Sequence, residues 1–109
     1  MKHTIAAFLT LCAFAHPAFA LEQEACQEKI VEGQRLGLIK TLANDGGAIV
    51  VIVDENAYSN SSYDAKVGIA KNLQCAIVGP NKVLVDIQFR SHKSKKLLAQ
   101  WNAGDLSVK

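Results

Sequence analysis

The amino-acid sequence predicts a small α+β domain in which two helices pack on an antiparallel sheet and one disulfide joins the helices. Three observations lead to this fold class. One segment is rich in Glu, Gln and Lys, a second has a broad apolar helical face, and several short apolar runs are separated by turn residues. Read in chain order, these segments predict the element order α-β-β-α-β-β.

The first twenty residues have the layout of a secretory signal peptide. Lys2 and His3 give a positive start, residues 5–15 form an apolar run, and Ala18-Phe19-Ala20 is a cleavage site of the A-x-A type. The apolar run is shorter than the roughly 20 residues that a membrane span needs. We therefore expect cleavage after Ala20, export to the periplasm or the medium, and no transmembrane segment after cleavage.

Cleavage would leave a single domain, residues 21–109, with two cysteines. In an exported protein Cys26 and Cys75 predict one disulfide, and the absence of a C-x-x-C pair argues against redox or zinc chemistry. Loss of Lys2 reduces the 12 basic side chains to 11 against 10 acidic ones, a net charge of +1. This balance argues against a nucleic-acid partner, which usually requires a strong basic excess.

The first helix is predicted over residues 22–35, where polar helix formers dominate and Gly33 and Gly37 discourage continuation. Asn44-Asp45-Gly46-Gly47 then stands between two apolar runs, and Asp-Gly in that setting is a hairpin signal. The alternative is one helix over residues 22–43, because five apolar side chains share a helical face: Val31, Leu36, Leu38, Ile39 and Leu42.

Residues 48–53 predict a strand at the centre of the sheet. Five consecutive β-branched residues make it apolar on both faces, which is typical of a strand buried on both sides. A polar loop over 54–62 leads to the second helix. We expect Ser61 to cap this helix, with Asp64 in its first turn, and we expect its end near Val78, before a Gly-Pro pair.

The last third of the chain predicts a hairpin and a short final strand. Residues 82–89 and 97–101 alternate between apolar and polar side chains. Their apolar faces coincide when three pairs lie opposite one another: Phe89–Leu97, Ile87–Ala99 and Val85–Trp101. This register leaves an odd-numbered loop at 91–95, and five residues are favoured because a three-residue loop usually requires Gly. A final strand is expected at 106–108, after a turn at 102–105.

The tip of this hairpin, residues 90–96, is the first candidate binding site, and we call it the basic tip. One interpretation is that its cations keep the tip soluble and protect a sheet edge. The other is that they contact an anionic surface such as phospholipid, lipopolysaccharide or an acidic protein patch, with His92 adding pH dependence. The candidate residues are Arg90, His92, Lys93, Lys95 and Lys96.

Three aromatic side chains form a second candidate patch. Tyr58 and Tyr63 bracket the start of the second helix, and they either hold the loop on the sheet or line a small pocket. Trp101 shares a strand face with Leu97 and Ala99, which favours a place in the core over a recognition role. No metal site is expected, because the spacing of the nearby carboxylates fits no calcium loop: Asp54, Glu55 and Asp64.

The sequence predicts binding in preference to catalysis. It contains no G-x-S-x-G turn and no glycine-rich phosphate loop, and its one histidine after cleavage lies in a hairpin tip. We therefore expect no enzyme activity and no cofactor. The leading expectation is a non-catalytic module that binds another periplasmic or secreted protein. The alternative is an envelope accessory protein that contacts anionic lipid or glycan through the basic tip.

Overall fold

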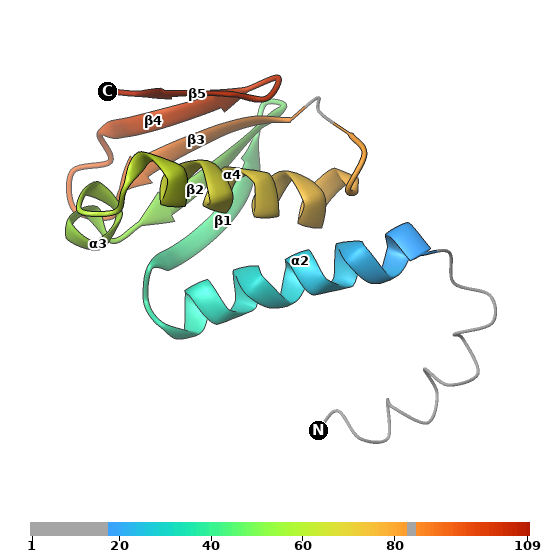
Figure 1. Cartoon of the computed structure of the whole chain (residues 1–109). Coiled ribbons are helices and arrows are strands. Elements are labelled where there is room, and N and C mark those ends of the chain that lie inside the picture. The colour runs from blue at the N-terminus through green and yellow to red at the C-terminus, as the bar shows by residue number, and fades with distance from the viewer. Residues whose placement is uncertain (1–17, 83–84) are drawn as a thin grey trace.

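The computed structural model describes residues 18–82 and 85–109, and it is a small α+β domain, as predicted, with a five-stranded sheet (Figure 1). The predicted signal peptide lies outside the described residues except for its last three. The elements in chain order are α2 (Ala18–Arg35), β1 (Ile39–Asp45), β2 (Ala48–Val53), α3 (Glu55–Ser59), α4 (Tyr63–Val78), β3 (Asp86–Ser91), β4 (Leu97–Asn102) and β5 (Asp105–Val108).

The sheet is mixed, so the prediction of a purely antiparallel sheet is wrong. Its strand order is β1-β2-β3-β4-β5, and β2 pairs with β3 in parallel while the other neighbours are antiparallel. The cause is the segment α3–α4, which carries the chain back across the sheet before β3 begins, as a parallel connection requires. The centre of the sheet is therefore β3, and the predicted central strand β2 lies one place from the edge.

The hairpin β1–β2 is confirmed against the alternative of one long helix. Asp45 lies opposite Ala48, and the two residues between them form the turn. Gly46 and Gly47 both have positive φ, 62° and 92°. A two-residue turn of this kind needs positive φ at both positions, which side-chain-bearing residues adopt only at a cost.

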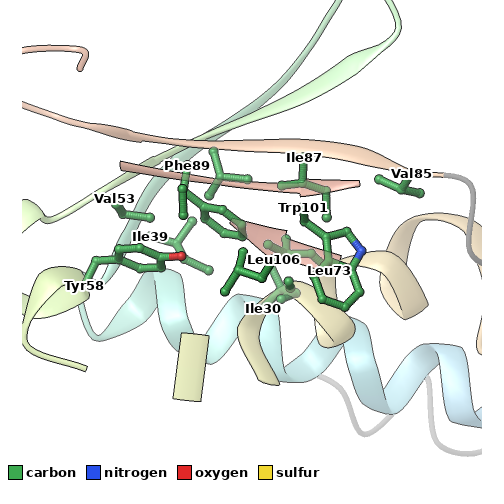
Figure 2. Close-up of a cluster of buried hydrophobic side chains, with 13 residues drawn as sticks. Ile30, Ile39, Val53, Tyr58, Leu73, Val85, Ile87, Phe89, Trp101 and Leu106 are labelled. Atoms are coloured by element: carbon green, nitrogen blue, oxygen red, sulfur yellow. The ribbon is translucent and has the colours of Figure 1, made fainter. Parts of the chain in front are cut away.

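Strand β2 is buried on one face only, in contrast to the prediction. Val51 and Val53 are fully buried, whereas Ala48, Val50 and Ile52 are half-buried. Figure 2 shows the strands on one side of the core side chains and the helices on the other. The run of β-branched residues therefore reflects the preference of a strand as much as its burial.

The hairpin β3–β4 keeps the predicted faces but not the predicted register. Ile87 lies opposite Trp101 and Phe89 opposite Ala99, two residues away from the expected pairs, with an irregularity between Phe89 and Arg90. Strand β3 continues to Ser91, so the five-residue connection covers 92–96. The expected final strand is present as β5, and it pairs antiparallel with β4.

Helix α4 begins one residue later than predicted. Its N-cap is Ser62, whose Oγ accepts a hydrogen bond from the amide of Ala65 at 3.1 Å. Ser61 instead donates its hydroxyl to the carbonyl of Ala57 at 2.9 Å. This bond belongs to the short helix α3, which occupies part of the expected loop and is capped by Asp54. Of the two neighbouring serines, Ser62 therefore caps α4, and Ser61 bonds to the end of α3.

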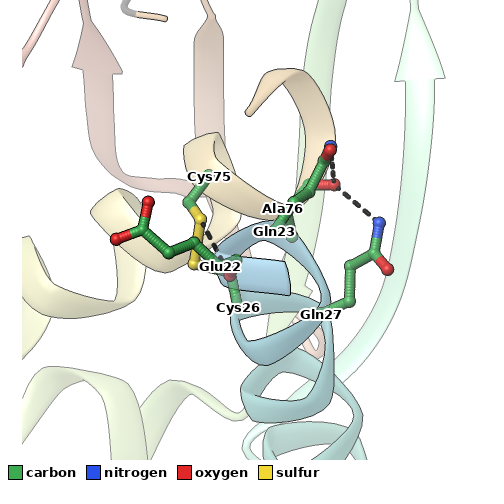
Figure 3. The surroundings of a disulfide bond; sticks show 6 residues. All are labelled: Glu22, Gln23, Cys26, Gln27, Cys75 and Ala76. Carbon is green, nitrogen blue, oxygen red and sulfur yellow. Dashed lines mark hydrogen bonds between the residues drawn. A yellow bond between two sulfur atoms is a disulfide. The ribbon is translucent and has the colours of Figure 1, made fainter. Parts of the chain in front are cut away.

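The predicted disulfide is present and joins α2 to α4 (Figure 3). The Cα atoms of Cys26 and Cys75 are 5.9 Å apart. Beside it, the amide nitrogens of Gln23 and Gln27 each donate to the carbonyl of Ala76 at 3.1 Å. None of the described helices is long and apolar enough to cross a membrane.

One polar atom is enclosed in the core without a partner. Tyr58 is 1% exposed and its ring stacks on Phe89 with centroids 5.2 Å apart, and its hydroxyl has no hydrogen-bond partner among the described residues.

A buried unpaired hydroxyl such as that of Tyr58 costs about 1–3 kcal/mol of stability. We therefore expect Tyr58→Phe to raise the free energy of unfolding by about 1 kcal/mol in denaturant titrations. Tyr63→Phe is the matched control, because the Tyr63 hydroxyl does donate, to the carbonyl of Leu106 at 3.1 Å, and its removal should lower that free energy.

The same hydroxyl gives this prediction a pH signature. Burial raises the pKa of Tyr58 above its usual value. Below the unfolded pKa of about 10 the hydroxyl is neutral in both states, and its effect on the free energy of unfolding is constant. As pH rises from there towards the folded pKa, only the unfolded chain releases the proton, so the folded state loses stability. The stability of wild type relative to Tyr58→Phe should fall above pH 10. A pH-independent difference would contradict the assignment.

Candidate functional site

The basic tip is held in shape by one buried serine. Ser91 is fully buried, and its Oγ accepts hydrogen bonds from the amides of Lys93 and Ser94 at 3.1 and 3.3 Å. The same hydroxyl donates to Oε1 of Glu55 at 2.6 Å. Glu55, a side chain from α3, thus helps to fix the turn through Ser91. The spacing of these two residues in the sequence did not predict this contact.

Two of the predicted cations bond to the tip itself. Arg90 donates through Nε to Gln88 at 3.0 Å and through Nη1 to the carbonyl of Lys95 at 2.9 Å. Lys95 has a positive φ of 65°, and its Nζ donates to the carbonyl of His92 at 3.0 Å. Lys93 and Lys96 are exposed. The tip therefore presents fewer uncommitted cationic groups than its sequence suggests.

His92 lies against the end of β2 and is half-buried, not isolated in the loop. The carbonyl of Val53 accepts from the backbone amide of His92 at 3.0 Å and lies 3.2 Å from its Nδ1. Because a carbonyl only accepts, this contact places the ring hydrogen on Nδ1. The other ring nitrogen, Nε2, is 3.9 Å from Oδ1 of Asp54.

The carboxyl of Asp54 brings negative charge to the tip. Its pKa is lowered chiefly by the hydrogen bond from the amide of Ala57, a change that burial opposes, and further by electrostatic interaction with His92, Lys40 and Lys93. Together with Glu55, it offsets part of the charge of the tip. A flat cationic surface is therefore a poor description of this site.

The three aromatic residues of the second candidate patch do not meet at the surface. Tyr58 and Trp101 are 1% and 2% exposed, whereas Tyr63 is exposed. The indole Nε1 of Trp101 donates to Oε1 of Gln74 at 3.1 Å inside the core. Alternation along the strands predicts such burial, but it does not show which helix supplies the partner.

An apolar groove that sequence reasoning missed lies between α2, α4 and β1. It encloses about 280 Å³, and Gln27 and Gln34 flank it. Its apolar side chains are Ile30, Val31, Leu42, Leu73, Ala76 and Ile77. Three of these are well exposed: Val31 at 60%, Leu42 at 37% and Ile77 at 40%. We call these residues the apolar groove. Their grouping depends on how three separate elements pack, so no local sequence signal marks it.

The described part of the chain contains no group of three or more His, Cys, Asp or Glu side chains placed to hold a metal ion. In comparisons with known proteins, no family model, no curated protein and no solved structure matched this chain.

Proposed function

We propose that this protein is an exported, non-catalytic module that binds another periplasmic or secreted protein through the apolar groove. The observation that carries the proposal is the exposure of Val31, Leu42 and Ile77 around one concave site. Apolar side chains gathered on a surface are typical of interaction sites, whereas scattered ones need no explanation. The disulfide is compatible with an oxidising compartment outside the cytoplasm.

The position of the groove at a sheet edge adds to this proposal. Strand β1 is an edge strand, and all its residues after Ile39 are exposed. An edge strand leaves backbone donors and acceptors available to a partner. A protein segment lying along β1 would place side chains beside the groove, so that polar backbone contacts and apolar burial act together.

The second candidate is contact between the basic tip and anionic lipid or glycan. It is favoured by the exposure of Lys93 and Lys96 on a turn that Ser91 holds in one shape. It is weakened by the neighbouring carboxyls of Asp54 and Glu55. Such a contact should weaken steeply with salt, because exposed charges are screened over about 8–10 Å, whereas an apolar interface should change little.

The test is a quantitative pull-down from envelope extract with the exported domain at low and high salt. The groove variant combines Val31→Ser and Ile77→Ser, and the tip variant replaces Lys93, Lys95 and Lys96 by Ser. Leu36→Ser is the matched control, because Leu36 is 68% exposed and lies outside the groove. Circular dichroism and thermal unfolding check that each variant folds.

We expect the same partner on wild type, the tip variant and Leu36→Ser at both salt concentrations, and its loss from the groove variant. Loss at high salt and from the tip variant would instead establish the basic tip as the contact. Equal capture by the groove variant would refute the role of the groove.

A further inference from the structure

A second cavity lies beside the disulfide and is separate from the apolar groove. It encloses about 570 Å³ between α2, α4 and the turn that joins β4 to β5, a volume in the range of small-molecule sites. Trp101 and the Cys26–Cys75 disulfide form apolar parts of its wall, and Lys71 and Gln74 contribute polar groups. We call it the disulfide pocket.

One wall of the disulfide pocket presents hydrogen-bond donors. Lys71, Gln74 and Cys75 are spaced i, i+3 and i+4 along α4, so they share one face of the helix. Gln74 is 9% exposed, and its amide oxygen is occupied by the indole N–H of Trp101. The amide nitrogen is the group of this side chain that is left to donate. Together with the exposed ammonium of Lys71, it suits a carboxylate.

The facing wall carries the opposite charge. Glu22 lines the pocket from α2, and Figure 3 shows its carboxylate directed away from Gln23 and Gln27, on the side of the disulfide. The pocket thus has the carboxylate of Glu22 on α2, the ammonium of Lys71 on α4, and an apolar wall from Trp101 and the disulfide. These groups match a small molecule that carries both charges beside an apolar group.

We propose that the disulfide pocket binds a small zwitterion with an apolar side chain, of the class of the free α-amino acids. Lys71 and Gln74 hold the carboxylate, Glu22 holds the ammonium group, and Trp101 with the disulfide contacts the side chain. This site is independent of the apolar groove, so the failure of either proposal leaves the other intact.

Trp101 makes the test direct, because it is the single tryptophan of the sequence and it lines the pocket. Its fluorescence and its indole N–H resonance are followed while L-leucine, N-acetyl-leucine and leucinamide are titrated into the oxidised domain. We expect leucine to shift both signals. N-acetyl-leucine, which lacks the ammonium, and leucinamide, which lacks the carboxylate, should bind about tenfold more weakly or not at all.

The variants test the assigned groups one at a time. Lys71→Gln and Glu22→Gln should each weaken leucine binding about tenfold, and Lys82→Gln, an exposed lysine outside this pocket, should leave it unchanged. Gln74→Glu keeps an acceptor for the indole and places a negative charge where the carboxylate would lie, so it should abolish binding. If that variant does not fold, the effect of Lys71→Gln on leucine binding still tests whether the carboxylate is recognised.

Three results would overturn the proposal. The first is no change in the Trp101 signals at millimolar leucine. The second is equal affinity for leucinamide or N-acetyl-leucine, which would show that the charged groups are not recognised. The third is an equal effect of Lys82→Gln and Lys71→Gln, which would mean general attraction to a positive surface.

Discussion

Replacing Cys26 and Cys75 together by serine is expected to lower the free energy of unfolding by about 4 kcal/mol. The disulfide closes a separation of 49 residues, and cross-linking a loop of that length restricts the unfolded chain to roughly this extent. A domain of this size has little stability in reserve. Guanidinium titration of residues 21–109 in the oxidised wild-type and double-variant forms measures the difference, and thiol counting verifies that Cys26 and Cys75 are paired in the wild-type form.

The loss should be concentrated in α2. Ile30 is its one buried apolar residue among those described, and the side chains of Gln23 and Gln27 also attach it to α4 through the carbonyl of Ala76. Hydrogen exchange in the double variant should therefore accelerate most in α2 and least in β3. A loss below about 1 kcal/mol, or uniform acceleration, would show that packing alone holds the helix.

Leu73→Ala is expected to lower the free energy of unfolding by about 2–5 kcal/mol. Leu73 is fully buried in the centre of α4, so truncation removes apolar burial and leaves a cavity in a closely packed core. A lower denaturant midpoint, with an unchanged dependence of the free energy of unfolding on denaturant concentration, would report the loss.

Ile77→Ala is the matched control on the same helix. Ile77 lies one turn further along α4 and is 40% exposed, so its truncation should cost less than about 1 kcal/mol. Both side chains line the apolar groove, yet only Leu73 should be needed for stability. Similar losses for the two variants would mean that Ile77 belongs to the core, and its exposure could then no longer support the proposed interface.

Local signals in the sequence predicted those features that depend on a few neighbouring residues. The hairpin β1–β2 follows from the tandem glycines, which supply two positive φ angles. The end of α4 at Val78 follows from Gly79, which has a φ of 110°. The disulfide was predicted from the two cysteines that the expected cleavage after Ala20 would leave in an exported protein.

Features that depend on distant partners were not predictable in this way. The parallel pairing of β2 with β3 is decided by the path of α3 and α4, and the shape of the basic tip is decided by Glu55, which lies 36 residues before Ser91 in the chain. The apolar groove and the disulfide pocket each combine side chains from three parts of the fold. A single sequence contains these residues but not their proximity.

The parallel contact between β2 and β3 has a consequence for how the chain folds. The hairpin β1–β2 and the meander β3–β4–β5 each pair strands that are adjacent in sequence, so each can form within microseconds. Joining them requires α4 to be in place, because β2 and β3 are separated by the whole connection. We expect this docking of two locally formed halves to be the rate-limiting event, since non-local pairing must overcome the entropy of loop closure before it gains contacts. Substitutions of residues where β2 pairs with β3 should then slow folding. Substitutions in the β1–β2 turn or in the connections within β3–β4–β5 should mainly speed unfolding.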